Sequence, residues 1–170
     1  QFQADDETLF KTLVAAKELG ALVMVHAENG DVIDYLVKKA LEEGNTDPIY
    51  HALTRPPEVE GEATGRAATL TGLANSQLYV VHVSCAEAAE KIAQARNKGI
   101  DIWGETCPQY LVLDQTYLEK PDFEGAKYVW SPPLREKWNQ DILWNALKTG
   151  QLQTIGSDQC SFDFAERSLH

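Results

Sequence analysis

The chain has 170 residues, enough for one domain with a hydrophobic core, and its 44% hydrophobic and 24% charged residues are typical of soluble globular proteins. Its formal net charge is −11, from 15 basic and 26 acidic side chains. A chain this acidic repels phosphate groups, so nucleic acid is not an expected partner. The apolar stretches are far shorter than the roughly 20 residues of a membrane span, so no membrane is expected either.

The two ends of the chain and its cysteines indicate how much of a protein it represents and in which compartment that protein is found. Gln1 is not a natural start, and the residues after Asp158 do not complete another structural unit, so we expect residues 1–170 to be one partial domain of a longer protein. We expect no signal peptide at the start of the chain. The three cysteines have no zinc-type spacing, and their odd number favours a reduced, cytoplasmic compartment.

Helical spacing of apolar residues recurs in five segments, and caps mark several of their ends. Asp5 or Asp6 can cap the first helix, and Gly20 can end it. Ser84, followed three residues later by Glu87, has the form of a capping box. The predicted helices cover about 6–19, 31–43, 58–73, 85–98 and 135–148.

Four short apolar runs lie between these helices and predict β-strands at 21–26, 77–83, 100–106 and 153–157. The proline-containing segment 45–57 is expected to be a loop, and 109–133 to be irregular apart from a short helix at 114–119. The last long helix is expected to bury one apolar face, made of Trp138, Ile142, Leu143 and Leu147.

Strands that alternate with helices predict an α/β fold with a parallel sheet. A closed (β/α)₈ TIM barrel needs eight strands and typically about 250 residues, and this chain offers four βα units. Two architectures follow, an open four-stranded sheet or half of a barrel. The polar residues at the strand ends favour the half barrel.

Three of the predicted strands lead directly into a residue that can bind a metal ion. His26 ends the first strand, His82 lies at the end of the second, and Asp158 follows the fourth. A single histidine in an apolar strand is more often a core residue, but three such residues at barrel-type strand ends are harder to dismiss. Neutral imidazoles suit zinc and similar ions, and Asp158 can act both as a ligand and as a general base.

Two cysteines and one histidine are assigned no chemistry. Neither Cys85 nor Cys160 has a recognisable Cys-His-Asn context, so both are interpreted as small buried thiols. His51 lies in a polar, proline-rich loop and is expected to be solvated.

Two further polar residues each precede a proline. Arg55 is expected to form a structural ion pair with Glu58 and Glu62 at a helix start, in preference to clamping a substrate. Ser131 lies between Trp130 and a proline, and a loop made rigid by proline can present main-chain N–H and C=O groups to a ligand.

Five motifs along the whole chain resemble the cyclic amidohydrolases, and most closely the D-hydantoinase and dihydropyrimidinase family. They are Val-His-Ala-Glu-Asn-Gly (25–30), Val-His-Val-Ser (81–84), Gly-Glu-Thr-Cys-Pro-Gln-Tyr-Leu (104–111), Trp-Ser-Pro-Pro-Leu-Arg (130–135) and Gly-Ser-Asp-Gln-Cys (156–160). The resemblance implies a segment of a metal-dependent TIM barrel, about four βα units from the helix before strand five to just past strand eight.

The resemblance also implies roles for individual residues. His26 and His82 match two ligands of one metal ion, Asp158 matches a ligand of a second ion that also acts as the base, and Ser131 matches a serine whose main chain binds the ring. A His-x-His pair, a carboxylated lysine that bridges the ions, a supporting tyrosine and a substrate-contacting asparagine are expected outside the segment. Many relatives have histidine where this chain has Gln159.

The activity implied for the longer protein is hydrolysis of a cyclic amide, in which a hydantoin or dihydropyrimidine ring opens to an N-carbamoyl amino acid. Two divalent ions are expected, with zinc favoured over manganese or cobalt, and a homo-oligomer, a tetramer or dimer. Dihydroorotase and allantoinase are alternatives with the same chemistry. A non-enzymatic dihydropyrimidinase-related assembly protein is a third alternative, but that group generally lacks the metal ligands.

Overall fold

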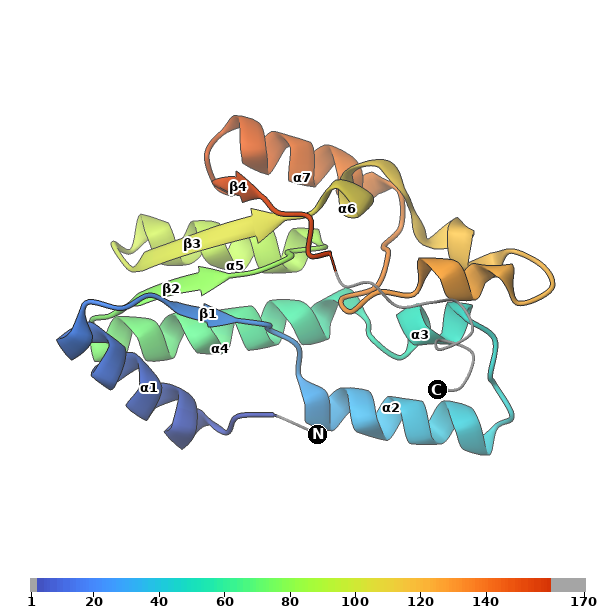
Figure 1. Cartoon of the computed structure of the whole chain (residues 1–170), viewed down its shortest axis with the longest axis horizontal. Coiled ribbons are helices and arrows are strands. Elements are labelled where there is room, and N and C mark those ends of the chain that lie inside the picture. Colours follow the sequence, from blue (N-terminus) through green and yellow to red (C-terminus); the bar gives the residue numbers. More distant parts are fainter. Residues whose placement is uncertain (1–2, 160–170) are drawn as a thin grey trace.

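A parallel sheet organises the computed structural model, which describes residues 3–159 (Figure 1). Each strand pairs in parallel with the next strand along the chain, in the order β1-β2-β3-β4. The predicted α/β fold with a parallel sheet is therefore confirmed. The strands are shorter than the sequence predicts: β1 is Val23–Val25, β2 Gln77–Val80, β3 Asp101–Thr106 and β4 Thr154–Ile155.

The five long helices that the sequence predicts are present: α1 Asp6–Leu19, α2 Gly30–Glu42, α4 Pro57–Ala74, α5 Ala86–Asn97 and α7 Trp138–Lys148. The short helix predicted at 114–119 is a 3₁₀ helix, η1 Gln115–Glu119, and a second one is η2 Glu124–Tyr128. Two five-residue helices were not predicted, α3 Ile49–Leu53 and α6 Pro108–Val112. Five residues are too few to show a helical period, so the sequence pattern predicts loops in both places.

The helix caps follow the sequence at α1 and depart from it at α5. The Asp5 carboxylate accepts the N–H of the residue three positions on, at 2.8 Å, and Gly20 ends α1 with φ 65°. The capping box predicted at Ser84 is wrong. Cys85 is the N-cap of α5, and the Ser84 hydroxyl is bonded to Glu60 instead.

The core lies between the sheet and the helices on one of its faces. Leu78, Val80 and Ile102 alternate along β2 and β3 toward this face and are at most 2% exposed. The opposite face carries large apolar side chains that the described residues leave uncovered, Met24 and Trp103, which are in register with each other through Tyr79.

Helix α7 covers the core with a narrower stripe than the sequence predicts. Leu143 is fully buried and Leu147 packs against the core, but Trp138 and Ile142 are 49% and 42% exposed. Their predicted burial is wrong because, among the described residues, the buried stripe of the helix is made of Asn139, Leu143 and Ala146. Within residues 3–159, no helix has the length and apolar character needed to cross a membrane.

The packing of α4 against α5 can be tested with a matched pair of glycines. A Cβ at Gly61 would lie 2.8 Å from the Glu87 Cβ, whereas one at Gly65 would meet the flexible Lys91 side chain at 3.3 Å. We expect Gly61→Ala to lower the free energy of unfolding by about 1–3 kcal/mol through overpacking. Gly65→Ala should be neutral or stabilising by up to about 1 kcal/mol, because alanine favours helix. Urea unfolding measures both; equal effects would contradict this packing.

Candidate metal and substrate site

Two histidines meet at the carboxyl ends of adjacent strands. His26 follows β1 directly, and His82 lies two residues after β2, where the Val81 N–H extends the strand pairing to the Val25 carbonyl at 3.2 Å. The Nδ1 atom of His26 lies 2.9 Å from the Nε2 atom of His82. Their ring centroids are 4.7 Å apart at an interplanar angle of 70°. The sheet thus aims one ring nitrogen of each residue at the same point.

The second nitrogen of His26 is bonded to a carboxylate that the sequence analysis missed. His26 Nε2 lies 2.9 Å from an oxygen of Glu28, which can only accept, so the imidazole proton lies on Nε2 and the Nδ1 lone pair faces His82. Burial alone would raise the pKa of Glu28, but the hydrogen bond from His26 and nearby positive charges outweigh it and lower that pKa. The only signal was its position two residues after a candidate ligand.

His82 is buried, only 5% exposed, and has a left-handed backbone with φ 45°. Such a conformation is uncommon for a residue with a Cβ and is concentrated at functional sites. Burial, and then the neighbouring His26, lower the pKa of His82, while the charge of Asp158 opposes this shift. His82 is therefore neutral at neutral pH, which is the form that binds metal ions.

This geometry fits a metal ion shared by the two imidazoles. Two nitrogens bound at about 2.0–2.1 Å in a tetrahedral site lie about 3.3 Å apart, so the observed 2.9 Å needs to open only slightly. The bond from His26 to Glu28 is the carboxylate–histidine arrangement that commonly supports metal ligands. The buried Nδ1 of His82 has no partner within residues 3–159.

The structure places Asp158 near the histidines without bringing it into contact with them. It follows β4 at the same end of the sheet, is exposed, and has φ 45°. Its charge reaches His82, but among residues 3–159 no hydrogen bond or ion pair joins it to either histidine. In that part of the chain, no three His, Cys, Asp or Glu side chains gather closely enough to hold an ion.

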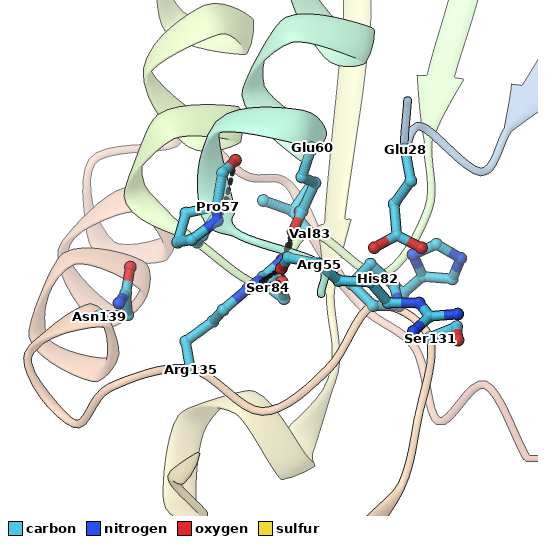
Figure 2. Close-up of polar contacts among 12 residues, drawn as sticks. Glu28, Arg55, Pro57, Glu60, His82, Val83, Ser84, Ser131, Arg135 and Asn139 are labelled. Carbon is cyan, nitrogen blue, oxygen red and sulfur yellow. Dashed lines mark hydrogen bonds and ion pairs between the residues drawn. The ribbon is translucent and has the colours of Figure 1, made fainter. Parts of the chain in front are cut away.

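A pocket of about 580 Å³ opens beside His26. Glu28, Arg55 and Ser131 line it (Figure 2). Ser131 therefore reaches the same pocket as His26. The ion pair predicted between Arg55 and the two glutamates is wrong. Glu62 is paired with Arg66, at 3.1 Å, while the Arg55 guanidinium donates to a main-chain carbonyl at 3.2 Å and lines the pocket.

The loop that carries Ser131 is fixed from two sides. His51 Nε2 lies 2.8 Å from the Trp130 carbonyl, and the Tyr110 hydroxyl donates to the Pro132 carbonyl at 2.6 Å. The prediction that His51 is solvated is therefore wrong. The unpredicted helix α3 turns His51 toward the loop, and a contact across 79 residues leaves no local pattern in the sequence.

A buried ion pair joins this loop to the segment that carries His82 (Figure 2). Arg135 and Glu60 are 5% and 2% exposed, with 2.8 Å between guanidinium and carboxylate. Arg135 also donates to the Ser84 hydroxyl at 2.9 Å and to the Arg55 carbonyl. Burial lowers the pKa of Arg135, but the charge of Glu60 outweighs it and leaves that pKa raised. The pair fixes Ser84, two residues from His82.

The thiols do not behave as nucleophiles. Cys85 is fully buried, and burial, with the charge of Glu60, raises the pKa of its thiol well above the ordinary value. Burial likewise raises the pKa of Cys107 to about 12. A neutral thiol is a poor nucleophile, which agrees with the interpretation of Cys85 as a structural residue. Cys160 lies outside the described residues.

Comparisons with known proteins give one consistent result. The D-hydantoinase of Geobacillus stearothermophilus is 85% identical over 163 residues, which are 96% of this chain and 35% of that protein. A crystal structure of D-hydantoinase at 85% identity, and that of the dihydropyrimidinase from Brevibacillus agri NCHU1002 at 78%, both superpose with a TM-score of 0.95. Each match covers 96% of this chain and 35% of the solved one. No family model matches the chain.

These matches identify the class of protein to which the chain is related: it is homologous to cyclic amide hydrolases. More narrowly, it is homologous to one segment of enzymes named D-hydantoinase and dihydropyrimidinase. It spans about a third of the length of the relatives that it matches.

The buried ion pair can be compared with an exposed one. Arg135→Met leaves the Glu60 carboxylate buried without its partner, so we expect the free energy of unfolding to fall by about 3–5 kcal/mol. The control, Arg66→Met, removes an exposed arginine that is paired with Asp6 at 2.7 Å, and should cost about 1 kcal/mol or less. Chemical denaturation of both variants measures the difference. A small effect at Arg135 would show that the buried pair does not stabilise the loop.

Proposed function

We propose that the chain is the second half of a (β/α)₈ TIM barrel, from the helix before strand five to just past strand eight. Four parallel strands in consecutive order, joined through helices, support this proposal. So does the second face of the sheet, where Met24 and Trp103 are exposed. In a closed barrel this face would turn inward and be covered by the other strands.

The activity that we propose for the complete protein is hydrolysis of a hydantoin or dihydropyrimidine ring to an N-carbamoyl amino acid. One observation carries it: His26 Nδ1 and His82 Nε2 point at each other across 2.9 Å at the carboxyl ends of adjacent strands. Active sites of TIM barrels lie at this end. The names of the relatives, D-hydantoinase and dihydropyrimidinase, support the choice of ring.

His26 and His82 are the residues that would bind one divalent ion, and Asp158 the second, with a carboxylated lysine contributed from outside this segment. The ions, zinc in preference to manganese or cobalt, would supply the Lewis acid that polarises the ring carbonyl and makes a water acidic. Glu28 keeps His26 in the tautomer whose Nδ1 lone pair is free.

The remaining steps belong to Asp158 and Ser131. The Asp158 carboxylate takes the proton from the attacking water and passes it to the ring nitrogen that leaves. The main chain of Ser131, in the pocket beside His26, binds the ring amide. A homo-oligomer and a cytoplasmic location, both predicted from the sequence, complete the proposal.

A complete enzyme is needed to test the activity. Replacing the matching 163-residue segment of the Geobacillus stearothermophilus D-hydantoinase by this chain gives one, here called the segment graft. The segment graft should open hydantoin and dihydrouracil, lose activity with a chelator, and regain it with zinc. Unmodified Geobacillus enzyme is the control. Turnover of dihydroorotate or allantoin alone would favour the alternatives, and a folded graft without any hydrolysis would refute the proposal.

The role of Asp158 predicts a large loss of activity without loss of the fold. Asp158→Asn removes the proposed base and weakens a ligand, so kcat for hydantoin should fall at least about 10²–10⁴-fold in the segment graft. Asp101→Asn, at the amino end of β3, is the matched control and should retain most of the activity. Assays of kcat, metal content and circular dichroism separate the two. Near-normal kcat in Asp158→Asn would remove this residue from the mechanism.

A further inference from the structure

Ser131 lines the pocket, and the main-chain carbonyls of Trp130, Ser131 and Pro132 differ in their partners. The Trp130 carbonyl accepts the N–H of His51 Nε2 at 2.8 Å. The Pro132 carbonyl accepts the hydroxyl of Tyr110 at 2.6 Å. Within residues 3–159, neither the N–H nor the C=O of Ser131 between them has a hydrogen-bond partner. The carbonyls on both sides of Ser131 are therefore anchored, while its own main-chain N–H and C=O are open.

The backbone of Ser131 is suited to a donor–acceptor pair. A residue before proline is disfavoured in helical conformation and adopts an extended one, in which its own N–H and C=O point to the same side. Its hydroxyl turns toward His51, with 3.4 Å between Oγ and Nε2, so the main chain is the part left for a ligand. Ser131 borders the pocket together with Glu28 and Arg55 (Figure 2), and His26 lines the same pocket.

Both anchors keep one protonation state near neutral pH. Burial, and then the charge of Arg55, lower the pKa of His51 to about 4, so its imidazole is neutral and donates from Nε2. Burial raises the pKa of Tyr110 well above its usual value, and the side chain is only 3% exposed. Its hydroxyl therefore stays a donor. The hydrogen bonds from His51 to the Trp130 carbonyl and from Tyr110 to the Pro132 carbonyl are therefore both kept near neutral pH.

We propose that His51 and Tyr110 are positioning residues that hold the main chain on either side of Ser131, at the Trp130 and Pro132 carbonyls, so that the N–H and C=O of Ser131 face a ring amide together. The N–H and C=O of an amide inside a small ring lie on the same edge, a pattern that complements the main chain of one extended residue. This inference rests on the proposed function, in which Ser131 binds the ring. It assigns the specificity for cyclic amides partly to two side chains that do not touch the substrate.

The test uses Tyr110→Phe in the segment graft with hydantoin as substrate. Losing one neutral hydrogen bond to the loop should raise KM about three- to tenfold, with kcat within about twofold and the metal content unchanged. KM is expected to change because the ring amide is bound alike in the ground and transition states. Thr71→Val is the matched control, since it also removes a buried hydroxyl, one that donates to the Ala67 carbonyl at 2.8 Å within α4.

His51 provides a second, independent arm. His51→Leu should raise KM as Tyr110→Phe does, and His51→Gln should restore most of the affinity, because its amide nitrogen can take the place of Nε2. A purely structural role would lower stability without this rescue. Equal KM values in Tyr110→Phe and Thr71→Val, or a loss of kcat or metal in place of a change in KM, would overturn the inference. A folded graft without hydrolysis would overturn the proposed function, and the inference with it.

Discussion

Parallel pairing of successive strands is the constraint on which every part of the site depends. Because β1 to β4 run in the same direction and in chain order, their carboxyl ends lie along one edge of the sheet (Figure 1). His26 and His82 are 56 residues apart in the sequence, yet this pairing brings their ring nitrogens to 2.9 Å. No local motif could do so, and the loops after the strands can vary without disturbing the sheet.

The buried Glu60–Arg135 ion pair is the second interaction on which the site depends, because it holds the loops around the histidines together. The guanidinium reaches the Ser84 hydroxyl, beyond His82, and the carbonyl of Arg55, which lines the pocket. One buried cation therefore connects the segment after β2, the start of α4 and the loop that follows Ser131. A buried charge is costly unless its partners are complete, which makes this arrangement specific for one geometry.

The sequence predicts more of the fold than of the site. Apolar periodicity and strand–helix alternation predicted the sheet and the five long helices, because these signals are local. The two candidate histidines were found because each follows an apolar strand. Glu28 as the partner of His26, the anchoring role of His51 and the ion pair of Arg135 were not found, since each depends on where the folded chain brings distant loops. For the same reason, the apolar pattern of α7 predicts Trp138 and Ile142 in the core, although both are exposed.

The central claim is that His26 and His82 bind one metal ion. Anomalous X-ray diffraction from crystals of the zinc-loaded segment graft, collected on both sides of the zinc absorption edge, tests it most directly. The account predicts a peak about 2.0–2.1 Å from both His26 Nδ1 and His82 Nε2, with Glu28 still bonded to His26 Nε2. A zinc peak elsewhere, with the two imidazole nitrogens bonded to each other at the distance seen here, would contradict it.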